Sequence, residues 1–527
     1  MDNQLNKQIK FATEARQEII AGIDLLADTV KTTLGPRGRN VVIERPGDHP
    51  LVTKDGVTVA KSINLRDSFK NLGVQLIKEA ASRTNDVAGD GTTTATVLAQ
   101  ALVKEGNKLI MAGYSPDSIR NEMETAMIDV LECLESMAVP VETTEDIENV
   151  GTVSANGDRS IGRLLAQALE TVGKYGVVYV DEARGFKTEL ETVEGFKFDR
   201  GFITPYFISD KTKMRIVMDN PNVLVISKKI TSINEIITVL EEVARAGKPL
   251  LIIADDVDGD ALQGLILNKL RGTIDVCAVR SPGVGDFKLD LLDDIAVFSN
   301  TETCISSEDL SSTRYLGKLK KVIIDKSSTT LVCQNSAKNN IEQRLVQLKQ
   351  KLESNNLNDE DYAKIKNRIS KLTGRVAVLR IGAATQVELA EKKDRVDDAL
   401  HATRAAVEAG ILPGGGCALL CAKHTIISDK LLKRKMNLLG YAAFLKAIEA
   451  PFRQILTNAG IEPAKILAKM KFSKNNMGYD VRNERYCNMM NDGIVDPHKV
   501  CRSALENAMS IAGMVLIVDS AIVEDTA

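Results

Sequence analysis

Residues 85–94 read Asn85-Asp86-Val87-Ala88-Gly89-Asp90-Gly91-Thr92-Thr93-Thr94, so two glycines bracket a carboxylate and three hydroxyl side chains follow. The next residues, 95–99, begin an apolar helical pattern. The first backbone N–H groups of a helix have no partner within it, so they can face a ligand in the preceding loop. An anion is the ligand that such a helix start favours.

Asp90 makes this loop more specific than a general anion site. Its carboxylate would repel a bare phosphate, and a divalent cation shared between the carboxylate and the phosphate oxygens removes that repulsion. Phosphate together with Mg2+ implies a nucleotide. The alternative is a threonine-rich helix cap without a ligand, and this stretch alone leaves both interpretations open.

Two further turns of small residues precede this loop, at 33–36 (Thr-Leu-Gly-Pro) and 53–56 (Thr-Lys-Asp-Gly). Either could be a plain connection between apolar elements. Three such turns before residue 95 favour a phosphate pocket whose walls are backbone. None of them is a Walker A loop, and no dinucleotide-binding glycine motif follows a strand.

The composition is that of a globular protein with several domains. At ~150 residues per domain, 527 residues predict three or four. A net charge of -3 argues against a nucleic-acid partner. The eight cysteines form no zinc pattern and are expected to be buried free thiols. The polar N-terminus and the lack of ~20 consecutive apolar residues predict a cytoplasmic protein without a membrane partner.

The middle of the chain has a different pattern from its two ends. Between about 194 and 375, strand and helix patterns alternate, whereas long helical patterns dominate before and after. The helix expected at 260–270 is apolar nearly all round, which predicts either two buried faces or one exposed apolar face. Residues 341–372 predict a helical hairpin that protrudes from the surface.

Taken together, these segments resemble the group I chaperonins, the GroEL-like ATP-driven folding machines. The resemblance covers nearly all 527 residues, and the family also lacks a Walker loop. The stretches that carry it occur in family order at 33–42, 53–57, 88–98, 199–202, 398–406 and 414–416.

The resemblance implies a multidomain α+β fold of three nested domains. A mostly helical equatorial ATP-binding domain would comprise residues 1–136 and 410–527. A small α/β intermediate hinge would comprise 137–193 and 377–409. The α/β apical domain, which binds substrate and lid, would be inserted in the middle of the chain at 194–376.

The resemblance also implies an ATPase with ATP, Mg2+ and K+ as cofactors. Asp90 would bind Mg2+, Asp55 would lie near the attacking water, and the hinge would deliver Asp398 when it closes. Lys54 lies where the family uses the backbone beside a potassium ion. The residues expected to bind the nucleotide and its ions are Thr33, Leu34, Gly35, Pro36, Lys54, Asp90, Gly91, Thr92, Thr93, Thr94, Gly415, Asp480, Val481, Arg482 and Asp496.

Unfolded polypeptides and a co-chaperonin lid are the partners that the resemblance implies, on a homo-oligomer of two stacked heptameric rings. Both partners would bind an apolar rim on the apical domain. The residues expected to form this rim are Phe202, Tyr206, Phe207, Ile237, Leu240, Leu262, Ile266 and Leu267.

Three departures from the family pattern indicate a diverged paralogue. Residues 480–482 are Asp-Val-Arg where the family commonly has Asn-Ala-Ala, Gln386 replaces a glutamate that pairs with a neighbouring subunit, and residues 520–527 lack a Gly-Gly-Met tail. A foldase that hydrolyses ATP and a holdase with weak ATPase therefore both remain open. The retained Asp55, Asp90 and Asp398 favour the foldase, whereas a phosphotransferase is disfavoured because no acceptor pocket can be recognised.

Overall fold

The computed structural model describes residues 7–47, 50–173, 176–183, 185–210, 214–283, 285–305, 315–334, 337–352, 359–470 and 476–524. The chain divides into two compact units, which we describe separately. The first unit contains residues 1–170, 180–190 and 379–527, and the second contains 171–179 and 191–378. The further division into equatorial and intermediate parts stays a prediction.

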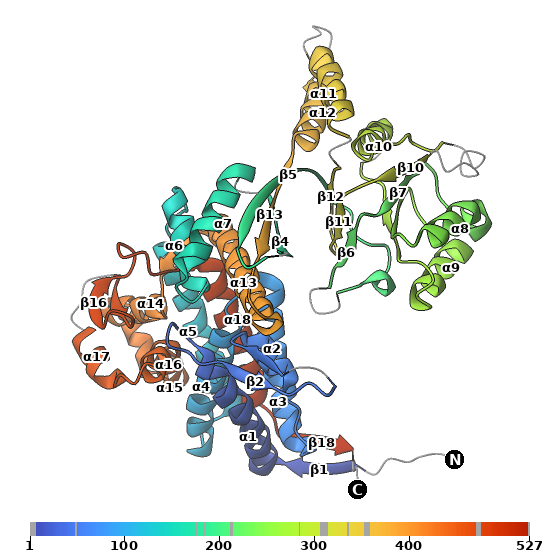
Figure 1. Cartoon of the computed structure of the whole chain (residues 1–527). Coiled ribbons are helices and arrows are strands. Elements are labelled where there is room, and N and C mark those ends of the chain that lie inside the picture. The colour runs from blue at the N-terminus through green and yellow to red at the C-terminus, as the bar shows by residue number, and fades with distance from the viewer. Residues whose placement is uncertain are drawn as a thin grey trace. The chain divides into compact units, whose positions relative to one another are not determined.

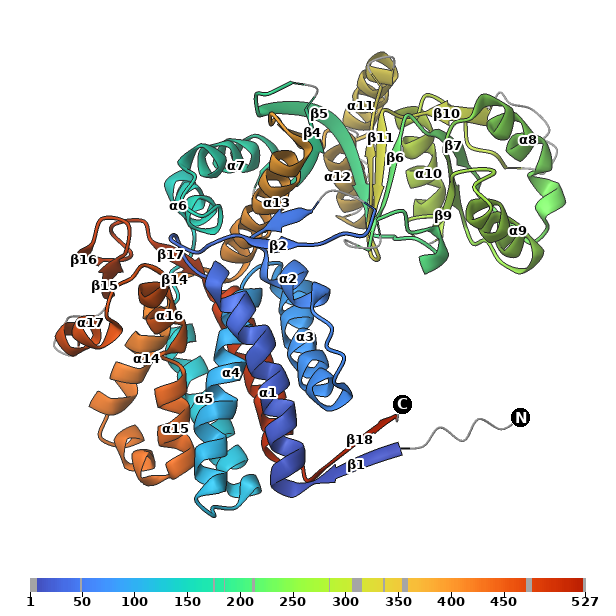
Figure 2. The same ribbon diagram turned by 60° about the horizontal axis from the view of Figure 1, so that its bottom comes forward.

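The first unit is mostly helical, and most of its longest helices run side by side in Figures 1 and 2. These are α1 (Ala12–Val30), α3 (Ser68–Ala88), α4 (Thr92–Met111), α5 (Pro116–Met137) and α18 (His498–Leu516). The long helix α13 (Gln386–Ala409) lies beyond one end of this group in Figure 2. The shorter helices are α2 (Gly56–Ser62), α6 (Thr144–Ser154), α7 (Arg159–Val172), α14 (Cys417–Ser428), α15 (Leu439–Ala447), α16 (Ala450–Asn458) and α17 (Pro463–Met470), with 3-10 turns η1 (Lys31–Thr33) and η7 (Leu432–Asn437).

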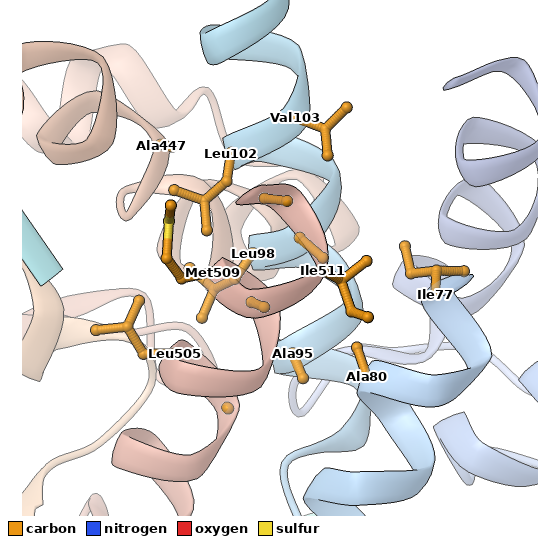
Figure 3. Packing of buried hydrophobic residues seen from close by; sticks show 14 of the residues in the cluster. Ile77, Ala80, Ala95, Leu98, Leu102, Val103, Ala447, Leu505, Met509 and Ile511 are labelled. Carbon is orange, nitrogen blue, oxygen red and sulfur yellow. The ribbon is translucent and has the colours of Figure 1, made fainter. Parts of the chain in front are cut away.

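Helices α4 and α18 meet in the middle of this unit's core (Figure 3). Ala95, Leu98 and Leu102 recur every three or four residues on α4, as Leu505 and Met509 do on α18, and all are buried. This period places them on one face of each helix. The packing fixes α4, and with it the loop that contains Asp90.

Four short antiparallel strand pairs complete the first unit. They are β1 (Lys7–Phe11) with β18 (Ser520–Glu524), β2 (Val41–Ile43) with β3 (Leu51–Thr53), β14 (Ile411–Pro413) with β17 (Val495–Pro497), and β15 (Met477–Asp480) with β16 (Arg485–Asn488). The β14–β17 pair sets Leu412 opposite Asp496, which brings Asp496 next to the glycine turn at 414–416. Of the predicted divergent tail, residues 525–527 lie outside the described residues.

The second unit contains a four-stranded sheet with the order β10-β7-β8-β9. Its parallel strands β7 (Asn222–Val225), β8 (Leu250–Ala254) and β9 (Val276–Arg280) alternate with α8 (Ile237–Ala246) and α9 (Gly259–Leu270), and β10 (Leu316–Lys318) is antiparallel to β7. Strands β7 and β8 are buried along their whole length, which explains their unbroken apolar sequences. Figures 1 and 2 show α8 and α9 on one face of this sheet and α10 (Asp286–Phe298) on the other.

A second sheet has the order β4-β13-β5-β12-β11-β6. Its strands are β4 (Val177–Glu182), β5 (Glu189–Phe198), β6 (Ile216–Asp219), β11 (Lys321–Ile324), β12 (Thr329–Val332) and β13 (Arg375–Ile381). Helices α11 (Lys338–Leu352) and α12 (Asp359–Leu372) form the predicted helical hairpin, whose connection at 353–358 lies outside the described residues. Buried Asp294 ties the hairpin to α10, because it accepts hydrogen bonds from Arg344 (2.9 Å) and Arg368 (2.6 Å).

All eight cysteines are free, and all but Cys421 and Cys501 are buried, as the sequence predicted. None of the described helices combines the length and apolar character that a membrane span requires.

Candidate nucleotide site

A cavity of about 530 Å³ lies within the first unit, a size typical of cofactor pockets. Every residue predicted from the sequence to bind nucleotide lines it, as do Asp55 and Asp398. The lining also includes a segment that sequence reasoning missed, residues 152–157 at the end of α6. Segments from both ends of the chain therefore form one pocket.

The amino end of α4 opens into this cavity. Gly89 ends α3 and Gly91 precedes α4, and both have left-handed backbones, with φ of 70° and 83°. A β-carbon on Gly91 would lie 2.5 Å from Val500, so glycine is required on both grounds. Among the described residues no side chain caps α4. The first-turn N–H groups can therefore face an anion in the cavity, and no described threonine takes the place of a cap.

The turn at 33–36 is held against the same cavity by a residue with no recognisable motif. Asn458 on α16 donates hydrogen bonds to the backbone oxygens of Lys31 (2.8 Å) and Leu34 (2.9 Å). Thr33 Oγ1 lies 3.5 Å from Thr93 Oγ1, so this turn reaches the start of α4. A lone asparagine more than 400 residues away gives no signal in the sequence.

Asp55 caps α2 and lines the cavity with the same carboxylate. It accepts hydrogen bonds from Val57 N (3.2 Å), Thr58 N (2.9 Å) and Thr58 Oγ1 (2.5 Å). The preceding turn can approach α4 because Gly56 has no side chain, since a β-carbon there would lie 2.3 Å from Thr93 Oγ1. Asp55 is therefore a firmly oriented acid beside the start of α4.

Asp90 lies at the centre of an acidic cluster. It accepts hydrogen bonds from Ser154 Oγ (2.8 Å) and Gly91 N (2.5 Å). Burial raises the pKa of Asp90, these two hydrogen bonds partly offset that effect, and the charge of Asp55 raises it again. Burial raises the pKa of Asp398 well above its usual value, and the charges of Asp55 and Asp90 add to this.

This cluster fits a divalent cation. Carboxylates that share a buried site disfavour each other's ionisation, and a cation among them reverses that effect. The described residues contain no group of three or more potential protein ligands in metal-binding positions. Mg2+ usually takes one or two carboxylates and completes its shell with water and phosphate oxygens, so Asp90 could hold it in this cavity without further protein ligands.

Asp496 is another acid that lines the cavity. Burial and the charge of Asp90 raise its pKa from 3.8 to about 7, although the backbone N–H groups of Gly415 and Gly416 donate to it and oppose the shift. A folded-state pKa above the unfolded value means that folding requires proton uptake between those two pH values. Ionised Asp496 therefore destabilises the ligand-free protein, by an amount that grows from about pH 4 to about pH 7 and is then constant.

We expect Asp496→Asn to remove this destabilisation. Without nucleotide, the variant should melt at nearly the same temperature as the parent near pH 4 and a few degrees higher at pH 8. Thermal unfolding of both proteins across this pH range tests it. A difference in melting temperature that is the same at every pH would contradict the assigned titration.

Lys54 and the β15–β16 hairpin also line the cavity. Burial lowers the pKa of Lys54, Glu391 opposes this, and the charges of Arg395 and Arg482 lower it further. Asp480 accepts hydrogen bonds from the backbone N–H groups of Arg482 (2.9 Å) and Asn483 (3.2 Å). Residues 480–482, which depart from the family pattern, thus lie in a turn beside the cavity that these hydrogen bonds hold in place.

The residues predicted to form the apolar rim fall into three groups in the second unit. Tyr206, Ile237 and Leu267 are 64%, 44% and 47% exposed. The partly buried members, which pack against the core, are Phe202, Leu262 and Ile266.

Two predicted rim residues are core residues, which corrects the prediction. Phe207 is 0% exposed and Leu240 is 5% exposed, because η2 (Pro205–Phe207) and α8 turn these side chains into the core of the second unit. Exposed Leu270, which the sequence interpretation left out of the rim, lies on α9 with Leu267. Helix α9 buries Ala261 and Leu265, so it has one buried and one exposed apolar face.

Comparisons with known proteins agree with this architecture. The chaperonin gp146 from the bacteriophage EL 2 (Pseudomonas aeruginosa), crystallised in the presence of ATP-BeFx, has a similar fold in two crystal forms. Form II matches with a TM-score of 0.66 at 23% identity, over 98% of this chain and 99% of that one. Form I matches with a TM-score of 0.62 at 22% identity over the same shares. These likenesses confirm the predicted multidomain α+β chaperonin fold.

The sequence itself matches a protein family over residues 26–526, nearly its whole length. That match confirms the predicted GroEL-like relationship. The chain belongs to the TCP-1/cpn60 chaperonin family.

Proposed function

We propose that this chaperonin binds ATP in the cavity of the first unit and uses its binding and hydrolysis to fold non-native polypeptides. The observation that carries this proposal is the uncapped start of α4, which opens beside Asp90 in a cavity of nucleotide-compatible size. The similar fold of gp146, which was crystallised with ATP-BeFx, supports it.

The residues of the cavity have distinct parts in this proposal. The N–H groups at residues 92–94 and the threonine hydroxyls would bind the phosphates, with Thr33 and the turn at 33–36 beside them. Asp90 would hold Mg2+, which when bound neutralises charge on the phosphate oxygens. K+ would lie at the backbone of Lys54. Gly415, Asp480, Val481 and Asp496 would contact the nucleoside.

Asp55 and Asp398 are the acids proposed to handle the attacking water. Asp55 is fixed by three hydrogen bonds from α2, so it can orient a water molecule. The raised pKa of Asp398 makes its carboxylate a stronger base, which suits it to accept a proton from that water. Hydrolysis needs both functions, because water must be positioned in line and partly deprotonated.

A refolding assay tests the overall function and separates it from the holdase alternative. The foldase should suppress aggregation of a chemically denatured client and restore its native activity when ATP and Mg2+ are added. A holdase would suppress aggregation equally with and without ATP and would restore no activity. The second result would overturn the proposed folding cycle.

Membership of the family implies ring-shaped oligomers and polypeptide clients. Two stacked heptameric rings and a co-chaperonin lid are part of the proposal. Gln386, the first residue of α13, stands where the family pairs a glutamate with a neighbouring subunit, so switching between ring states is expected to differ. Mass measurement of the native assembly tests the number of subunits.

The exposed residues of α8 and α9 are proposed to capture clients, and we expect Leu267→Ser to weaken capture about tenfold. Burial of one leucine against a partner contributes ~1.5–3 kcal/mol, and serine forfeits it. Binding can be titrated with a fluorescently labelled denatured client. Because Leu267 is 47% exposed, the melting temperature should change little.

Leu289→Ser is the matched control for this experiment. Leu289 is also 47% exposed, but it lies on α10, across the sheet from α8 and α9. The control should capture clients like the parent. Equal losses in both variants would indicate general apolar stickiness and would refute a defined rim.

A further inference from the structure

The turn between α6 and α7 lines part of the nucleotide cavity and accepts hydrogen bonds from Arg482. Asn156 and Gly157 of this turn line the cavity, as Arg482 does. The Arg482 guanidinium donates one hydrogen bond to Gly157 O (3.0 Å) and a second to Asn156 O.

The turn has a shape that makes both carbonyls available. Asn156 and Gly157 have φ of 54° and 77°, and Gly157 N donates to Thr152 O at 2.6 Å. A β-carbon on Gly157 would lie 2.0 Å from Arg482 Cζ, so only glycine allows the guanidinium to lie this close. The close contact between the guanidinium and the turn therefore depends on both Arg482 and Gly157.

The hairpin side of the contact is also rigid. Asp480 accepts hydrogen bonds from Arg482 N (2.9 Å), Asn483 N (3.2 Å) and Asn483 Nδ2 (2.6 Å). Asp480 is itself buried. This network holds the backbone from which Arg482 projects, so less side-chain freedom is lost when its two bonds form.

Two other contacts hold the same segment at different points. Ser154 Oγ donates to Asp90 at 2.8 Å, at the proposed Mg2+ position. Arg395 on α13 lies 3.7 Å from Asp158. Arg482 adds the tie to the β15–β16 hairpin, on the proposed nucleoside side of the cavity.

We propose that Arg482 is a latch that holds the α6–α7 turn over the cavity, so that nucleotide enters and leaves only after its two hydrogen bonds break. Arg482 acts here as a positioning residue, through residues 156 and 157. The proposal rests on the proposed nucleotide site and adds a control over its exchange. It also gives a physical role to a departure from the family pattern at residue 482.

A latch has a kinetic signature that differs from that of a nucleotide ligand. The contact joins two parts of the chain and needs no nucleotide to form, so opening must precede both association and dissociation. Its loss should raise both rate constants by a similar factor and leave Kd nearly unchanged. Loss of a direct contact with the nucleotide would instead raise dissociation and weaken Kd.

We expect Arg482→Ala to raise both rate constants about fivefold or more, which is the scale of two charge-assisted hydrogen bonds on an exposed residue. Stopped-flow fluorescence with a labelled ADP measures both. Arg482→Lys should raise both rate constants by a smaller factor than Arg482→Ala, because an ammonium group cannot reproduce the planar fork of a guanidinium. Arg485→Ala is the control, since Arg485 lies on the same hairpin and pairs mainly with Asp492, with a longer contact of 3.9 Å to Asp480 and, among the described residues, no hydrogen bond to the turn at 156–157. Its two rate constants should equal those of the parent.

Hydrogen exchange of the nucleotide-free protein is a second, independent measurement of whether Arg482 holds the α6–α7 turn. The backbone amides of residues 155–160 should exchange faster in Arg482→Ala than in the parent or in Arg485→Ala. Unchanged exchange, unchanged rate constants or a rise in dissociation alone would each overturn the latch. If the parent bound no labelled ADP, the proposed function would fail, and the exchange experiment would still decide whether Arg482 holds the turn.

Discussion

Asp398→Ala should bind ATP and turn it over at least ~100-fold more slowly than the parent, the scale of a lost general base. The reason is its surroundings: burial and the charges of Asp55 and Asp90 raise the pKa of Asp398, which increases its basicity beside the start of α4. Alanine removes the proton acceptor without altering the phosphate-binding backbone. Steady-state phosphate release and equilibrium ATP binding, measured on the same preparation, check both halves of the expectation.

Two further variants show whether the charge of Asp398 is what matters. Asp398→Asn keeps the shape but cannot accept a proton, so it should be as slow as the alanine variant. Glu408→Ala removes an acid from the carboxyl end of the same helix, where Glu408 is exposed and pairs with Lys499 at 2.8 Å. This control should retain the parent's rate. Parent-like turnover in Asp398→Asn would remove Asp398 from the proposed chemistry.

Asp90→Asn should abolish the Mg2+ dependence of ATP binding and lower turnover by ~100-fold or more. A bound cation contributes several kcal/mol of charge stabilisation at transferring phosphate groups. Asparagine can still accept the hydrogen bond from Gly91 N through its Oδ1, and its Nδ2 can donate to Ser154 Oγ in place of the bond that Ser154 donates to Asp90, so the loop should keep its shape. Calorimetric titration of ATP with and without Mg2+ measures the loss.

The same substitution should stabilise the protein when no nucleotide is present. The pKa of Asp90 is raised by burial and by Asp55, so its ionised form destabilises the folded state at neutral pH. Asparagine removes that charge, and the melting temperature should rise at pH 7 and change little near pH 4. Gain of stability with loss of activity is the expected combination. A variant that loses stability at pH 7 would show that Asp90 is structural.

The start of α4 illustrates what could be predicted from local sequence. Two glycines around Asp90, followed by an apolar helical period, predicted a helix whose first N–H groups face a loop, and the structure has this arrangement. Glycine conformation and helix periodicity depend on neighbouring residues, so a short stretch is sufficient. The long-range grouping of this loop with Asp398 and Asp496 came only from the family resemblance.

The rim and the supporting residues show where the sequence was insufficient. An apolar side chain on a helix can face the core or the solvent, and the choice for Leu240 and Ile237 depends on how α8 packs on its sheet. Ser154 and Asn458 are single polar residues without a motif, yet they contact Asp90 and the turn at 33–36. Their roles depend on contacts between distant parts of the chain, which form only in the folded protein.

By itself, the sequence determined the left-handed turns, the helices that follow them and, through its family pattern, the chaperonin fold. These features depend on residues close together in the chain or on a pattern that spans it. Only the tertiary structure decided which acids share one cavity, which of them have raised pKa values, and that Arg482 reaches the turn at 156–157. Burial and charge interactions depend on distances through space, and the folded chain alone sets those distances.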